Sequence, residues 1–141
     1  METIDSNTAY EISRLFQVPQ RALFNAFVDE AILRKIWGVS SITVDARPGG
    51  QARARLQIED ENWDFTVTYE EVSSPEKLRW AVHFDRFPHK EIRVTLWFNA
   101  TADGAEVTIR MENFETTEER DANRQAWEAG LTTLEALIGN E

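Results

Sequence analysis

The segment from Thr116 to Ile138 has the pattern of a long amphipathic helix, and it ends a chain that is otherwise patterned as short strands. Its apolar residues recur at steps of four, three and four, which places them on one helix face: Trp127, Leu131, Leu134 and Ile138. Thr116 and Glu119 have the spacing of a capping box, which marks a helix start. Because nearly everything before this helix predicts sheet, its apolar face must pack against that sheet.

Alternating apolar and polar residues predict a series of strands between positions 10 and 111. The predicted ranges are 10–17, 42–47, 51–58, 63–70, 78–84, 92–99 and 107–111. Asp103-Gly104, between the last two, has the composition of a tight hairpin turn. The other connections are also short, which favours an antiparallel meander, because parallel strands need crossovers of about a dozen residues or more.

Two short helices are expected between the first and second strands. Pro19 suits the first turn of one helix, and Asp29 suits the N-cap of the next. Gly38 stands where a left-handed helix stop is expected, because glycine takes positive φ without steric cost. The apolar sides of the two helices consist of Leu23, Phe24 and Phe27, and of Ile32, Leu33, Ile36 and Trp37.

The 141 residues suit a single domain spanning 1–141, with the polar residues 1–8 expected to form a disordered tail. The net charge of −10 argues against binding to nucleic acid or to an anionic membrane. The chain has no cysteine, which excludes disulfides and thiolate chemistry. No apolar run is long enough to span a bilayer and no signal-peptide pattern is present, so we expect a cytoplasmic protein without membrane insertion.

Several short motifs occur in an order that narrows the fold. They are Val18-Pro19 before residues 23–27, Ile36-Trp37, Arg47-Pro48-Gly49-Gly50, Glu71-Val72 before Pro75-Glu76-Lys77-Leu78, and Trp127 with Leu131 and Leu134. From about Tyr10 to Ile138 they resemble the standalone domains similar to the C-terminal domain of the activator of the Hsp90 ATPase, within the Bet v 1/START-like superfamily. The resemblance implies an α+β helix-grip fold. In such a fold a curved antiparallel sheet wraps around a long C-terminal helix, and two short helices follow the first strand.

Gly130 lies inside the predicted terminal helix, where glycine costs roughly 1 kcal/mol relative to alanine. It therefore indicates either a close backbone approach or room for a bound molecule. Members of the resembled family often carry glycine directly before the helix tryptophan, where this chain has Ala126. The resemblance favours a ligand cavity between sheet and helix, and its candidate lining residues are Trp63, Phe65, Trp80, Trp127, Gly130 and Leu131. The alternative is an ordinary core, in which small residues match the volume of the tryptophan rings.

The two histidines form only a weak pattern for chemistry. His83 and His89 bracket Asp85, but metal sites usually need three or more converging ligands. The sequence contains no catalytic triad, phosphate loop or dinucleotide motif. We therefore assign no catalytic residue, no metal ligand and no cofactor.

Other charged residues are interpreted mainly as solvated surface. By strand parity Asp64 and Glu70 face water, whereas Glu71 shares a face with the aromatic residues of its strand. Arg120 and Arg124 lie on one side of the terminal helix. They either attract an anionic group at a cavity mouth or pair with acids of the same helix, and pairing is favoured.

Three functions follow as hypotheses. The leading one is a binding protein for an unidentified apolar or amphipathic small molecule, held between sheet and terminal helix. A co-chaperone partnership with Hsp90 is implied by the family name alone. A cyclase-like or hydrolase-like enzyme using the same cavity is the third, although a protein without catalytic activity is favoured. No pattern in the sequence indicates an oligomeric state.

Overall fold

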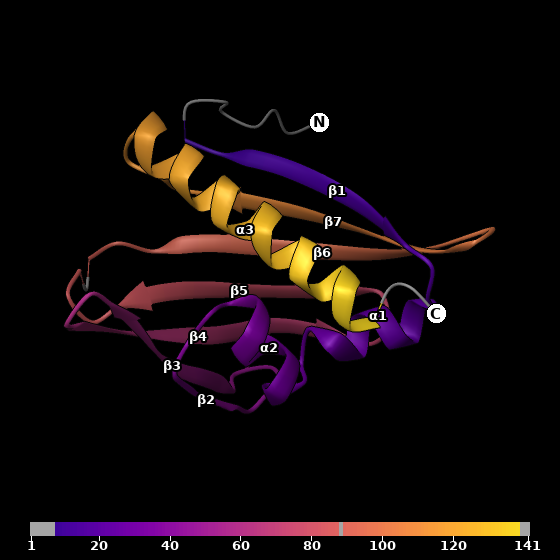
Figure 1. Cartoon of the computed structure of the whole chain (residues 1–141), viewed down its shortest axis with the longest axis horizontal. Helices are drawn as coiled ribbons and strands as arrows, with labels where there is room; N and C mark the ends of the chain where they lie inside the picture. Colours follow the sequence, from indigo (N-terminus) through magenta and orange to yellow (C-terminus); the bar gives the residue numbers. More distant parts are fainter. Residues whose placement is uncertain (1–7, 88, 139–141) are drawn as a thin grey trace.

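The computed structural model describes residues 8–87 and 89–138, which form an antiparallel sheet of seven strands and three helices (Figure 1). The strands lie in the order β1-β7-β6-β5-β4-β3-β2. Their bounds are β1 Tyr10–Phe16, β2 Ser41–Val44, β3 Gln51–Ile58, β4 Glu61–Ser73, β5 Lys77–Phe84, β6 Ile92–Thr101 and β7 Gly104–Glu112. The helices are α1 Gln20–Ala26, α2 Glu30–Ile36 and α3 Thr117–Ile138.

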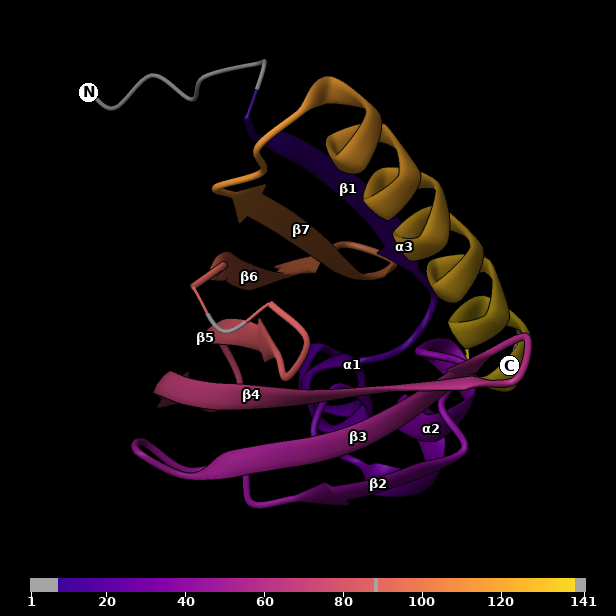
Figure 2. The same ribbon diagram turned by 90° about the vertical axis from the view of Figure 1, so that its left-hand side faces the viewer.

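The sheet curves, and all three helices lie on its concave side (Figure 2). From β2 onward each strand pairs with the next one in the chain, as the short connections predict. The first strand instead pairs with the last, with Tyr10 opposite Met111 and Phe16 opposite Ala105. The predicted α+β helix-grip architecture is therefore confirmed.

The helix termini follow the local sequence. The Asp29 carboxylate accepts a hydrogen bond from the backbone N–H of Ile32 at 3.1 Å, so it caps α2 as expected. Gly38 ends the same segment with a φ of 66°. At the start of α3, Thr116 Oγ1 accepts a hydrogen bond from the Glu119 N–H at 3.1 Å. This is the threonine half of the predicted capping box.

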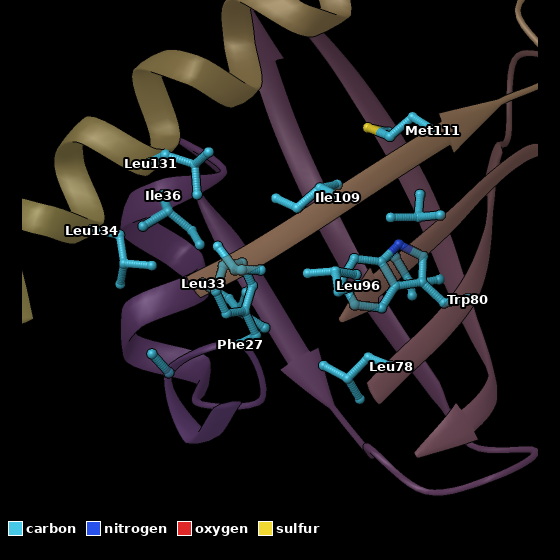
Figure 3. Close-up of a cluster of buried hydrophobic side chains, with 14 of the residues drawn as sticks. Phe27, Leu33, Ile36, Leu78, Trp80, Leu96, Ile109, Met111, Leu131 and Leu134 are labelled. Carbon is cyan, nitrogen blue, oxygen red and sulfur yellow. The ribbon is translucent and has the colours of Figure 1, made fainter. Parts of the chain in front are cut away.

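One hydrophobic core fills the space between the sheet and the helices. Leu131 and Leu134 of α3 are buried in it and lie close to Ile36 and Leu33 of α2 (Figure 3). On most strands of the sheet the buried residues alternate as period two requires, as with Val94, Leu96 and Phe98 on β6. The terminal helix is thus held by the short helices as well as by the sheet.

Two predictions about the strands were wrong in detail. The strand expected over 42–47 ends at Val44. The chain turns there, because the Arg47 N–H bonds to Asp45 O at 3.0 Å and the Gly49 N–H bonds to Tyr69 O at 2.8 Å.

The predicted tail over 1–8 lies mostly outside the described residues, which begin at Thr8. Thr8 O accepts a hydrogen bond from the Phe114 N–H.

The second correction concerns the side on which Glu71 lies. A β-bulge between Tyr69 and Glu71 shifts the register, so that Glu71 pairs with Arg79 and Val72 pairs with the buried Leu78. Simple parity therefore fails after Tyr69. The Glu71 carboxylate lies on the outer face, 3.3 Å from Lys77 Nζ.

Candidate functional site

A pocket of about 170 Å³ lies between the inner face of the sheet and the helices α2 and α3. Aliphatic and aromatic side chains make up nearly all of its wall, and no charged residue is among the described residues that line it. Such a concave, mostly apolar pocket with few polar groups is typical of small-molecule sites. Its lining residues are Ile36, Trp37, Leu56, Phe65, Val67, Trp80, Val82, Phe84, Ile92, Val94, Met111, Asn123, Ala126, Trp127 and Gly130.

The structure brings four of the six candidate residues together in this wall: Phe65 and Trp80 from the sheet, and Trp127 and Gly130 from α3. Trp63 instead lines a neighbouring hollow. Leu131 is 2% exposed and packs in the core, and it lines neither of these two spaces.

The neighbouring hollow is wider, at about 470 Å³, and adjoins the pocket toward the start of α3. The two spaces share five lining residues: Leu56, Val82, Phe84, Ile92 and Asn123. Trp63 and Phe87 form part of the outer wall of the hollow, with their ring centroids 5.8 Å apart. The pocket and the hollow therefore adjoin, and we call the two together the groove below, with the pocket as its narrow inner end and the hollow as its wide outer end.

Gly130 marks a close approach between two helices. A Cβ atom added at this position would lie 2.7 Å from the carbonyl oxygen of Ile36. The crossing of α2 and α3 therefore requires glycine here. This confirms the close backbone approach that was one of the two explanations offered for Gly130. The same position also contributes to the pocket wall.

Charged residues gather at the outer end of the groove, where one lysine pairs with two acids. Lys90 Nζ lies 2.7 Å from the carboxylate of Glu119 and 3.9 Å from that of Glu115. The hydrogen bond to Glu119 raises the pKa of Lys90 above its ordinary value. Lys90 therefore stays charged and tethers the segment before β6 to the first turn of α3.

The helix arginines pair as the sequence favoured. Arg124 Nε lies 3.1 Å from the Glu128 carboxylate, one turn further along α3, and Arg120 lies 2.8 Å from Asp121. Both pairs are within the same helix. An exposed pair of this kind contributes little to stability, typically below about 1 kcal/mol.

Asn123 is a polar residue of the inner pocket to which the sequence analysis assigned no role. Its Oδ1 accepts a hydrogen bond of 2.6 Å from the hydroxyl of Tyr10, a side chain that is 4% exposed. Asn123 precedes Trp127 by four positions, so it continues the apolar stripe by one turn. That spacing was available in the sequence, but a polar residue on an apolar stripe is easily assigned to the surface.

Two polar side chains outside the inner pocket, His83 and Asp64, are paired with charged neighbours. His83 Nε2 lies 3.1 Å from Glu91, and the hydrogen bond from Arg55 lowers the pKa of Asp64. No group of three or more histidine or acidic residues suited to a metal ion occurs among the described positions. Tyr69 is a buried residue whose hydroxyl has no hydrogen-bond partner in the described structure, and burial raises its pKa to about 12. Its hydroxyl therefore remains protonated and is no base at neutral pH.

Within residues 8–87 and 89–138, no helix has the length and apolar character needed to cross a membrane. The net charge of −10 belongs to a surface on which acids outnumber bases.

Comparison with solved structures gives many proteins of the same fold. Protein CV1439 from Chromobacterium violaceum superposes with a TM-score of 0.81 at 20% identity, over 95% of this chain and 99% of that one. Protein NE0264 from Nitrosomonas europaea gives 0.77 at 22% identity, over 96% and 97%. PFC0360w from Plasmodium falciparum, described as an HSP90 activator, gives 0.74 at 19% identity, over 92% and 95%. At these identities the likeness shows the fold alone.

No curated protein matches the chain. A family model does match, over residues 17–139, and its description is Activator of Hsp90 ATPase homolog 1-like protein. Because that match covers most of the chain, the protein belongs to the family of activator of Hsp90 ATPase homolog 1-like proteins, in the Bet v 1/START-like superfamily.

Proposed function

We propose that the protein binds a small, largely apolar molecule in the groove between the sheet and α3. The observation that carries this proposal is the apolar pocket of about 170 Å³ beside a wider hollow. A plain core would close such a space, because protein interiors pack to the density of organic crystals. Burial of apolar ligand surface in the pocket would supply the binding free energy, at about 25 cal/mol per Å².

The three tryptophans of the pocket wall suit this role. Trp37, Trp80 and Trp127 each present a large, rigid ring to the ligand space, and Trp37 packs edge-on against Trp80 at 6.1 Å between centroids. Aromatic walls of this kind bury much area at little cost in side-chain entropy. They favour a flat or ring-containing molecule.

Ala126 gives a direct test of the binding proposal. It lines the pocket yet is an exposed residue of α3, so Ala126→Phe fills the mouth of the pocket without disturbing the core. N-phenyl-1-naphthylamine, whose emission rises in apolar surroundings, is titrated into the wild-type protein and the variant. We expect Ala126→Phe to weaken binding about tenfold or more, equivalent to about 1.4 kcal/mol.

Ala129→Phe is the matched control, because Ala129 is exposed on the same helix and lines neither the pocket nor the hollow. It should leave the affinity unchanged. An equal loss of affinity in both variants argues against the groove as a ligand site. So does the absence of binding by the wild-type protein up to the solubility limit of the probe.

A second candidate function is action on Hsp90. It is favoured by the family description and by the likeness to the HSP90 activator from Plasmodium falciparum. If it holds, saturating amounts of this protein raise ATP hydrolysis by purified Hsp90. An unchanged rate, with binding of the probe intact, would leave small-molecule binding as the function.

A further inference from the structure

Asn123 occupies a distinctive place in the groove on which the proposed function rests. It lines both the inner pocket and the outer hollow, so a molecule extending from one to the other must pass it. Apart from the three indoles, it is the only one of the described residues lining the inner pocket whose side chain carries N–H donors. A single polar group in an apolar wall typically fixes the orientation of a ligand.

Tyr10 orients the carboxamide of Asn123. The Tyr10 hydroxyl lies 2.6 Å from Asn123 Oδ1 and 2.9 Å from Met111 Sδ, and the amide oxygen is the stronger acceptor. Burial raises the pKa of Tyr10 well above its usual range, so the phenol keeps its proton and remains the donor. With Oδ1 engaged, the two hydrogens on Nδ2 are left for another acceptor, and none of the described residues supplies one.

The charges near the groove decide which acceptor fits. No cationic residue is among the described residues that line the inner pocket, and the ammonium group of Lys90 at the outer end is held by Glu119 and Glu115. The guanidinium of Arg124, 5.9 Å from the Tyr10 ring, is likewise paired with Glu128. Burying a carboxylate there would cost its hydration without a counter-ion to replace it. The net charge of −10 also repels anions from the surface. A neutral oxygen acceptor meets neither penalty.

We infer that the groove selects apolar molecules that carry a neutral carbonyl oxygen, as in a ketone or ester, and that Asn123 recognises this oxygen through Nδ2. The apolar body of the ligand lies in the inner pocket against Trp80 and Trp127. Tyr10 acts as a positioning residue, since it touches Asn123 and not the ligand.

A matched set of probes tests this selectivity. 2-Acetylnaphthalene carries the carbonyl, 2-isopropylnaphthalene has a similar shape without an acceptor, and 2-naphthoate carries an anion. Their affinities for the wild-type protein and for Asn123→Leu are measured by quenching of tryptophan emission. Leucine matches asparagine in size but has no polar atom. We expect the ratio of ketone affinity to hydrocarbon affinity to fall about tenfold in Asn123→Leu, the usual effect of one lost hydrogen bond.

Tyr10→Phe provides a second variant. It keeps the Asn123 amide but removes the hydroxyl that orients it, so the ratio should fall less, by about threefold. An unchanged ratio in Asn123→Leu, or tighter binding of the naphthoate than of the ketone by the wild-type protein, overturns the inference. In either case, the proposed function still holds if the wild-type protein binds 2-isopropylnaphthalene. If neither neutral probe binds the wild-type protein, both proposals fall together.

Discussion

Replacing Gly130 by valine should lower the free energy of unfolding by about 3 kcal/mol, enough to lower the melting temperature by about 10 °C. A Cβ atom at this position would lie 2.7 Å from the carbonyl oxygen of Ile36, closer than a Cβ atom approaches a non-bonded oxygen in proteins. The neighbour is backbone, so it cannot rotate away as a side chain would. To accommodate valine, α2 and α3 must separate along a contact that anchors the terminal helix.

The control for this prediction is Ala129→Val, one position earlier on an exposed part of the same helix. There valine costs only its lower helix propensity, roughly 0.5 kcal/mol. Chemical denaturation monitored by circular dichroism measures both variants. Equal losses would show that the effect arises from propensity and that the helix crossing tolerates a side chain.

Leu134→Ala should cost about 3 kcal/mol of unfolding free energy, within the range found for buried leucines. Leu134 is 0% exposed and lies in the core cluster with Leu33 and Leu131. Truncation removes its transfer free energy and leaves a cavity between helix and sheet. The helix would then lose much of the contact that holds it over the groove.

Leu137→Ala is the matched control, since Leu137 is on the same helix but is 40% exposed. Its truncation should cost about 1 kcal/mol or less, in proportion to the smaller area that it buries. Denaturant midpoints at an unchanged m-value give both numbers. A Leu137→Ala loss as large as that of Leu134→Ala would contradict the packing of α3 described above.

The sequence predicted the frame of the molecule well because its signals are local. The stripe from Trp127 to Ile138 and the threonine cap at Thr116 define α3 without knowledge of any other element. Period-two alternation likewise identified the buried side of most strands. The motif order from Val18-Pro19 onward then indicated the family to which the chain belongs.

The groove depends on features that such local signals do not contain. Trp63 and Phe65 share a strand face, yet the curved sheet places one in the outer hollow and the other in the inner pocket. Leu131 and Trp127 share a helix stripe, but Leu131, beside the close crossing at Gly130, is buried in the core, whereas Trp127 lines the pocket. Neither separation can be deduced from periodicity alone, since it results from tertiary curvature and helix packing.

Asn123 and Glu71 illustrate two further limits. The role of Asn123 depends on a hydroxyl that lies 113 positions away in the sequence, at Tyr10. The outward position of Glu71 depends on a bulge that reverses strand parity and has no clear local signal. Long-range hydrogen bonds and register shifts therefore had to come from the structure.

The most direct test of ligand binding in the groove uses the indole N–H signals in ¹⁵N–¹H spectra, assigned with single Trp→Phe variants. Trp37, Trp80 and Trp127 line the inner pocket, whereas Trp97 lies on the outer face of the sheet between Lys77 and Arg110. Titration with N-phenyl-1-naphthylamine should shift the three pocket indoles and leave that of Trp97 in place. A shift at Trp97 as large as the others, or no shift at any pocket indole at saturating probe, would contradict binding between the sheet and the terminal helix.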